Sequence, residues 1–323
     1  MTENKSTETL SWPWRSPGDP VSLLAHRGGL GPWRENTLEA FRGALRLGAD
    51  GVELDVRRAA DGELVVHHDA SIPGLGPLNR FSRPELPDWV PSLGRALEAC
   101  AGASVNVEIK NSPLDPDHDP SEAIAGEVLQ ALTASLSRGA PTSPSRLVVS
   151  SFSPSTIAAF ASAVARSAGA AADSAGVSST GAGAASGRGS SATARGARAV
   201  RGTGGALAGA GRADTGSTPI EVAFGLLVSP AFDALDAVEH AAALGCSSLH
   251  PFHLQATSEL VERAHGEGLA VVTWTVNDPE AMAAVLGAGV DAVISDDVPG
   301  ALKAMGRSPG LVRESGRRGQ SRP

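Results

Sequence analysis

Residues 23–69 read LLAHRGGLGPWRENTLEAFRGALRLGADGVELDVRRAADGELVVHHD, and this stretch decides the fold. It holds three segments of strand length, with a helical pattern between the first two. Polar clusters lie in or directly after these segments: His26-Arg27, Glu53-Leu54-Asp55 and His67-His68-Asp69. Two acids one residue apart on a strand point the same way and can share a cation. Histidines on neighbouring strands can then move protons beside it, which indicates phosphoester chemistry.

The first strand is predicted over Val21–Ala25, an apolar run too short for a helix. A helix follows from Asn36 or Thr37, where Asn36-x-x-Glu39 is similar to a capping box. Capping alone would explain Asn36. Apolar residues then recur at helical spacing, and Gly48 is the expected stop.

The second strand is predicted over Gly51–Arg57, where apolar side chains alternate with Glu53 and Asp55. Asp61-Gly62 marks a tight turn before a further strand over Leu64–His68. Because this turn is too short for a helical crossover, we expect that strand to return antiparallel, partly outside a regular barrel count.

Strands and helices alternate through the rest of the chain. Further strands are predicted over residues 104–110, 146–151, 220–228, 247–250, 269–276 and 290–295, and further helices over residues 93–100, 121–136, from 155, 232–244, 257–267 and 279–286. This alternation predicts an α/β fold with a parallel sheet, and the nine strands fit a (β/α)8 TIM barrel plus the hairpin strand. A doubly wound open sheet is the alternative, but no GxGxxG follows the first strand.

The predicted barrel domain spans residues 21–305, between a flexible arm at 1–20 and a flexible tail at 306–323. Residues 166–218 are nearly all Ala, Gly, Ser, Thr and Arg. Such a segment has little large apolar surface to offset the entropy of ordering it. We therefore expect a disordered insertion after the fifth strand–helix unit, opposite the active face, and its Gly and Ser content argues against a long helix.

Composition narrows the class of protein. Hydrophobic residues make up 41% of 323, enough for a full core, and the formal net charge of −8 gives no sign of nucleic-acid binding. Two cysteines form neither a disulfide framework nor a metal motif. With no leader-like apolar segment at the start and no run long enough for membrane insertion, we expect a cytoplasmic location. The oligomeric state is not readable.

A metal site is the strongest chemical signal. Glu53 and Asp55 lie in the middle of a strand that a barrel covers on both faces, where carboxylates are unfavourable unless paired or metal-bound. Glu108, on the strand over residues 104–110, would add a third oxygen donor for a hard cation such as Mg²⁺ or Ca²⁺. The alternative is a salt-bridged pair of acids facing one of three arginines, namely Arg27, Arg57 or Arg58.

His26 and His68 are the candidate acid–base pair, because an unperturbed pKa near 6.5 suits proton transfer at neutral pH. One histidine could assist attack on phosphorus while the other protonates the leaving alkoxide. Only one of His67 and His68 can point inward, and the strand period does not say which.

Arg27 and Lys110 are candidates for holding phosphate charge, although a simple ion pair with Glu108 would also explain Lys110. Glu35 either suits the helix dipole or reaches the site. Trp274, near a strand end, either lines a substrate pocket or packs in the core.

The chain resembles the glycerophosphodiester phosphodiesterase family. The matching pieces occur in family order over about residues 21–302: His26-Arg27-Gly28, Glu35-Asn36-Thr37, Glu53-Leu54-Asp55-Val56, Asp61-Gly62, His68-Asp69, Val107-Glu108-Ile109-Lys110, Ser151-Phe152, His250-Pro251, Trp274-Thr275-Val276-Asn277 and Asp291 to Asp296. The resemblance implies a TIM barrel that hydrolyses small glycerophosphodiesters to sn-glycerol 3-phosphate and an alcohol, using a divalent cation such as Mg²⁺, Ca²⁺ or Mn²⁺.

By position, the resemblance makes Glu53, Asp55 and Glu108 the metal ligands and favours His68 over its neighbour as the partner of His26. Arg27 and Lys110 would lie by the phosphate. Two residues are inserted between Pro32 and Glu35 relative to the family pattern, and the low-complexity segment is foreign to it.

Two rival functions remain open. One is a related phosphodiesterase of lysophospholipase D or phosphoinositide type, acting on larger lipids, which a wide apolar groove would favour. The other is a phosphate-binding module on a degenerate barrel, which would be expected to lack part of the acid–base set.

Overall fold

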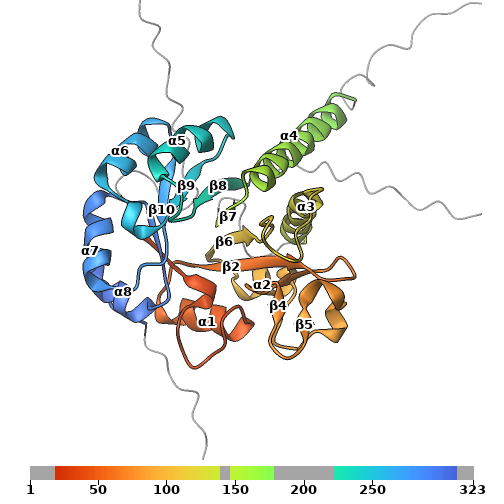
Figure 1. Ribbon diagram of the computed structural model, residues 1–323, viewed down its shortest axis with the longest axis horizontal. Coiled ribbons are helices and arrows are strands. Elements are labelled where there is room, and N and C mark those ends of the chain that lie inside the picture. Colours follow the sequence, from red (N-terminus) through yellow and green to blue (C-terminus); the bar gives the residue numbers. More distant parts are fainter. Residues whose placement is uncertain (1–18, 139–145, 178–221, 311–323) are drawn as a thin grey trace, which may run out of the picture. The chain divides into compact units, whose positions relative to one another are not determined.

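The computed structural model describes residues 19–138, 146–177 and 222–310. Eight parallel strands form a closed ring in the order β1-β11-β10-β9-β8-β7-β6-β2, and β2 pairs back to β1 (Figure 1). These strands are β1 Ser22–Ala25, β2 Gly51–Arg58, β6 Ser104–Ile109, β7 Leu147–Ser151, β8 Ala223–Val228, β9 Ser248–Pro251, β10 Ala270–Thr273 and β11 Ala292–Ser295. The (β/α)8 barrel predicted from the sequence is confirmed.

The helices lie on the outside of the ring, and each of them follows one of the barrel strands in the chain (Figure 1). They are α1 Leu38–Leu47, α2 Leu93–Ala99, α3 Ala123–Ser137, α4 Pro154–Val177, α5 Ala234–Ala243, α6 Ser258–Gly266, α7 Pro279–Ala288 and α8 Val298–Ala304. The last of these, α8, was not predicted. Its N-cap is Asp297, whose side chain accepts a hydrogen bond from the backbone N–H of Gly300.

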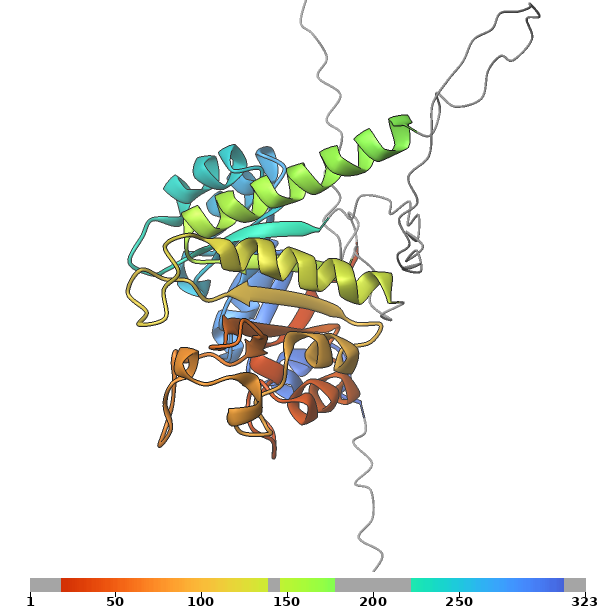
Figure 2. The ribbon, with the colours of Figure 1, turned by 90° about the vertical axis from the view of Figure 1, so that its right-hand side faces the viewer.

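The hairpin strand β3, Leu64–Val66, pairs antiparallel with β2, as its short turn predicts. The chain then makes a small two-stranded hairpin, β4 Ser71–Ile72 with β5 Gly76–Pro77, and two 3₁₀ turns, η2 Leu78–Arg80 and η3 Arg83–Glu85. Figure 2 shows this segment, in orange, at one end of the barrel strands. An apolar cluster of its own stabilises it, made by Ala59, Val65, Ile72, Leu78, Leu86 and Val90.

The barrel interior is filled by apolar side chains from strands on opposite sides of the ring, including Leu24, Val148, Val272 and Ile294. A polar layer also lies inside. There His250 is fully buried. Burial lowers the pKa of His250 to about 3, and its Nε2 lies 2.8 Å from Ser248 Oγ.

The first turn of α1 differs from the predicted capping box. Thr37, not Asn36, is the N-cap: its side chain accepts a hydrogen bond from the backbone N–H of Ala40. Asn36 has a positive φ of 56°, a conformation that asparagine tolerates better than most residues. Its side chain is therefore turned away from the helix, toward β2.

The chain divides into two units, Met1–Ala165 with Glu221–Pro323, and Arg166–Ile220. In the second unit, the described residues continue α4 as far as Val177, where the sequence argued against a long helix. Alanine, which recurs between Arg166 and Val177, has the highest helix propensity and outweighs the glycine and serine there. Most of the predicted 166–218 insertion and the whole of the arm up to residue 18 lie outside the described residues.

The start of the predicted C-terminal tail is held to the barrel. Both terminal nitrogens of the Arg307 guanidinium donate to the Asp50 carboxylate, at 2.6 and 2.7 Å. The backbone N–H of Gly310 donates to the carbonyl of Leu47. Residues 306–310 are thus ordered by partners far away in the sequence, which composition alone did not reveal.

Among the described helices, none combines the length and the apolar character that crossing a bilayer requires.

Candidate active site

Three carboxylates meet inside the barrel. Glu53 and Asp55 alternate with apolar residues on β2, and Glu108 is the direct partner of Asp55 in the parallel pairing of β2 with β6. All three residues are buried, and each offers a carboxylate oxygen within 4.8 Å of the others. The two-residue period of a strand and the register of the barrel therefore bring together the three predicted metal ligands.

The three carboxylates cannot all carry a negative charge at low cost when they lie this close together. Burial and the neighbouring Asp55 raise the pKa of Glu53 to about 8, and burial also raises the pKa of Glu108. Burial alone would raise the pKa of Asp55 too, but the charges of Lys110 and Arg27 outweigh it and hold that pKa well below its usual range. A further cation is what would let all three acids ionise together.

The donor set fits a divalent cation. Glu53 Oε1 is buried and has no hydrogen-bond partner, which is unfavourable for a carboxylate oxygen unless a ligand takes that place. Three carboxylates around one point are the hard oxygen donors that Mg²⁺, Ca²⁺ and Mn²⁺ prefer.

The alternative of a salt-bridged pair holds only in part. Arg27 Nε lies 3.3 Å from Asp55 Oδ2, but the guanidinium groups of the other two candidate arginines, Arg57 and Arg58, point elsewhere. Arg57 pairs with Asp115 and Asp117, and Arg58 with Asp119 and Glu127, so these arginines anchor the β6–α3 connection.

Lys110 lies between two of the acids. Its Nζ is 2.6 Å from Glu108 Oε1 and 3.0 Å from Asp55 Oδ1. Burial by itself would lower the pKa of Lys110, but these carboxylates outweigh it and keep the ammonium charged. The expected ion pair with Glu108 is present, and Lys110 also lines a cavity that it shares with both candidate histidines.

His26 follows β1 in the 3₁₀ turn η1, His26–Gly28, and its Nδ1 lies 2.7 Å from Asp296 Oδ1. Its other ring nitrogen, Nε2, is 4.0 Å from Glu53 Oε2. Burial would lower the pKa of His26, but the bond to Asp296 and the Glu53 charge outweigh it and raise that pKa above its usual value.

His68 follows β3, and its Nδ1 lies 2.6 Å from Asp69 Oδ1. Burial and the charge of Lys110 lower its pKa below the usual value. A cavity of about 180 Å³ is lined by both His26 and His68 together with Glu53, Glu108 and Lys110. His67 instead faces the ring of Trp89, with a centroid distance of 5.7 Å.

Of the three remaining candidate residues, two line this cavity and one does not reach the carboxylate cluster. Arg27 lines the same cavity, with its backbone N–H donating to Glu53 Oε2 at 3.1 Å. Trp274 also lines it, and its Nε1 donates to the carbonyl of His250 at 2.9 Å. Glu35 is 57% exposed and pairs with Arg27 at 3.2 Å, so the structure does not bring it to the carboxylate cluster.

Two further residues belong to the site and were not among the candidates. Asn36 Nδ2 donates to Asp55 Oδ2 at 2.7 Å, which orients that carboxylate. Asp296 orients His26 and is itself held by Asn277, whose side-chain amide donates to Asp296 Oδ2 at 2.7 Å. Register could have found Asp296: Ala25 pairs with Ser295, so the residues that follow these two strands lie side by side.

The buried acid cluster and the two histidines beside it lie at the end of the barrel strands where barrel enzymes carry their active sites, so the fold and the site are those of a barrel enzyme. A model of the glycerophosphoryl diester phosphodiesterase family matches residues 26–167 and 215–299. The chain therefore belongs to this family, and it is an enzyme of the phosphoric diester hydrolase class.

Individual proteins that are similar to this chain are phosphodiesterases as well. The chain is 26% identical over 296 residues to a glycerophosphodiester phosphodiesterase of Caldanaerobacter subterraneus subsp. tengcongensis, covering 85% of this chain and 93% of the relative. A phosphodiesterase of Oleispira antarctica, solved in complex with the product sn-glycerol-3-phosphate, has a TM-score of 0.60 at 22% identity, over 88% of this chain and 96% of that one. The glycerophosphodiester phosphodiesterase of Thermotoga maritima gives 0.56 at 23% identity, over 86% and 95%. At these identities the two structures show the shared fold.

Proposed function

We propose that this protein hydrolyses glycerophosphodiesters to sn-glycerol 3-phosphate and an alcohol, with a divalent cation held by Glu53, Asp55 and Glu108. The observation that carries the proposal is the buried cluster of these three carboxylates, with Glu53 Oε1 unpartnered, at a cavity that His26 and His68 also line. The cation would be Mg²⁺, Ca²⁺ or Mn²⁺, since all three take oxygen ligands. When bound, it supplies Lewis-acid polarisation of the phosphodiester.

The two histidines supply the proton transfers. Each has a carboxylate on Nδ1, Asp296 on His26 and Asp69 on His68, and this contact leaves Nε2 available to the substrate. The raised pKa of His26 and the lowered pKa of His68 set the two apart, as a pair that works as acid and base requires.

Two cations balance the charge that develops on the phosphoryl oxygens. Lys110 contributes a compact ammonium, and Arg27, which lines the same cavity, contributes a guanidinium. Arg27 has a positive φ of 52°, an unusual conformation for an arginine. This strained backbone conformation directs the backbone N–H of Arg27 at the Glu53 carboxylate, which helps to position a proposed metal ligand. Glu35 holds the Arg27 side chain from the surface, and Trp274, which lines the cavity, borders the substrate.

We also propose that the protein acts in a reducing, cytoplasmic setting on a small-molecule substrate. Cys100 and Cys246 are both free and buried, and burial raises the pKa of each thiol to about 12, which makes them unreactive.

Two single substitutions test the assignment. Glu53→Gln and His68→Ala should each nearly abolish hydrolysis of glycerophosphocholine while the circular dichroism spectrum is unchanged. Glu262→Gln, the same substitution at an exposed position of α6, is the matched control and should behave as the wild type. Activity near the wild-type level in either site variant would refute the role proposed for the substituted residue.

A further inference from the structure

A second, larger cavity opens beside the catalytic one. Its volume is about 860 Å³, and the two cavities share His68, Glu108, Lys110, Phe152, Leu227 and Trp274 as lining residues. A substrate whose phosphate contacts Lys110 can therefore extend into the larger space without leaving the site. Its volume is at the upper end of the range for ligand pockets and leaves room for more than a small headgroup.

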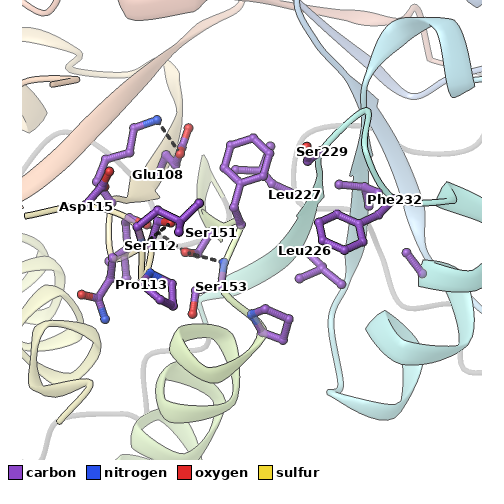
Figure 3. A pocket seen from close by; sticks show the side chains of 18 of the residues that line it. Glu108, Ser112, Pro113, Asp115, Ser151, Ser153, Leu226, Leu227, Ser229 and Phe232 are labelled. Carbon is purple, nitrogen blue, oxygen red and sulfur yellow. Dashed lines mark hydrogen bonds and ion pairs between the residues drawn. The ribbon is translucent and has the colours of Figure 1, made fainter. Parts of the chain in front are cut away.

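The surface that this cavity offers is mainly apolar. Figure 3 shows Leu226, Leu227 and Phe232 on the side facing Glu108, and Pro113 also lines the cavity. Phe152 packs edge-on against Trp274 with a ring-centroid distance of 5.3 Å, which fixes one aromatic wall.

Most polar groups in the wall are already used inside the protein. Ser151 Oγ donates to the carbonyl of Ile109, and the Ser229 and Asp233 side chains accept from the backbone N–H groups of Ala231 and Leu235. Trp274 Nε1 and the Asp115 carboxylate are likewise engaged, with His250 and Arg57. A ligand in this space therefore meets hydrocarbon more than free hydrogen-bonding groups.

Two large apolar side chains are left in water at this cavity. Leu114 is 94% exposed and Phe232 is 70% exposed, and both line it. Leu114 lies on the β6–α3 connection and Phe232 on the β8–α5 connection, where barrel enzymes carry their specificity. Exposed apolar side chains that line a cavity beside the catalytic groups are suited to contact an apolar part of a ligand.

The Leu114 connection is held in place before any ligand binds. Arg57 is buried and donates from Nε to the carbonyl of His68 at 2.7 Å, while its other nitrogens contact Asp115 and Asp117. One guanidinium thus ties the backbone of a catalytic histidine to the segment that carries Leu114, so the two keep a fixed relation.

Resting on the proposed function, we propose that this cavity binds an aliphatic chain of the substrate, and that the preferred diesters carry such a chain next to the glycerophosphate. Leu114 and Phe232 determine this specificity. The chain is carried either on the glycerol, as in a lysophospholipid, whose phosphate product keeps the chain, or on the alcohol that leaves, in which case the phosphate product is sn-glycerol 3-phosphate. Asp236 and His240 also line the cavity, so a cationic headgroup is the competing occupant.

Two substrate series measure the effect and separate the sources. The first is glycerophosphocholine with hexanoyl, octanoyl and decanoyl lysophosphatidylcholine, all used below their micelle concentrations. The second is glycerophosphoethanol with the hexyl, octyl and decyl esters of glycerophosphate. In one of the two series, kcat/KM should rise by about two- to fourfold for each methylene group that becomes buried in the cavity.

Variants assign the rise to the cavity. Leu114→Ser and Phe232→Ser should flatten the dependence of kcat/KM on chain length. Leu254→Ser removes an equally large leucine, 75% exposed and outside the cavity, and should keep the wild-type slope. A flat response in both series, with glycerophosphocholine still hydrolysed, would overturn the inference and leave the proposed function standing.

Other outcomes are equally decisive. A preference for glycerophosphocholine that Asp236→Asn weakens would mean that the cavity holds a cationic headgroup, against the inference. A slope that survives in both cavity variants would place the chain elsewhere, which also contradicts it. No turnover of any diester by folded, metal-loaded protein would overturn the proposed function itself.

Discussion

Replacing Asp296 with asparagine removes the charge that faces His26 and keeps the size of the side chain. The two side chains are 20% and 29% exposed, and the 2.7 Å contact between His26 Nδ1 and Asp296 Oδ1 is a charge-assisted hydrogen bond when the imidazole is protonated. Such bonds are worth about 1.5–3 kcal/mol. At about 1.4 kcal/mol per pH unit, the loss corresponds to roughly one to two pH units.

The direction of the expected pKa change follows from the effect of the Asp296 charge on His26. Asp296 helps to raise the pKa of His26, so Asp296→Asn lowers that pKa. The limb of the pH profile of kcat/KM that reports His26 should move to lower pH by about one to two units, whether the histidine acts as acid or as base. The assay is glycerophosphocholine hydrolysis at saturating metal.

Asp69→Asn is the matched comparison. Asp69 is paired with His68 at 2.6 Å but is 67% exposed, so water screens its charge. An exposed pair is worth about 1 kcal/mol or less, and the His68 limb should move by under about one pH unit. If Asp296→Asn leaves both limbs where they are, Asp296 does not set the pKa of His26. If Asp69→Asn moves the His68 limb further than Asp296→Asn moves the His26 limb, the exposure of the two pairs does not decide their strength.

Three further predictions concern residues around the site. Arg57→Met leaves the Asp117 carboxylate buried and unpaired, and should lower the free energy of unfolding in urea by about 3–5 kcal/mol; a loss below about 1 kcal/mol would contradict the buried pair. Lys110→Met should lower kcat/KM at saturating metal by about 10²- to 10³-fold in steady-state assays, and a loss under about tenfold would remove Lys110 from phosphate stabilisation. Gly225→Ala places a Cβ against the Ser248 hydroxyl and the ring of His250, and should cost about 1–3 kcal/mol in the same urea experiment, whereas a neutral result would mean that the polar layer gives way freely.

The regular part of the fold could be predicted because it depends on local patterns. Strand-length apolar runs, the two-residue alternation around Glu53 and Asp55, and the short Asp61-Gly62 turn all have their expected structures. The barrel then follows from the alternation of strands and helices. Once it closes, the pairing of β2 with β6 brings Glu108 beside Asp55 without further information.

The rest depends on contacts between distant parts of the chain. Asn36 looked like a helix cap, and only the positive φ at that position turns its amide onto Asp55. Asp296 is separated from His26 by 270 residues and meets it only through the register of β1 with β11. Arg307 lies in a stretch of tail-like composition, yet Asp50 binds it. Side chains such as Leu114 and Phe232 carry no pattern, so the cavity they border is visible only in three dimensions.

The most direct test of the central claim is release of glycerol 3-phosphate from glycerophosphocholine and glycerophosphoethanolamine by protein treated with EDTA, before and after addition of Mg²⁺, Mn²⁺ or Ca²⁺. The carboxylate cluster of Glu53, Asp55 and Glu108 predicts no release without metal and recovery with at least one of these cations. Full activity that persists in EDTA, or no release with any cation from folded protein, would contradict a metal-dependent glycerophosphodiesterase.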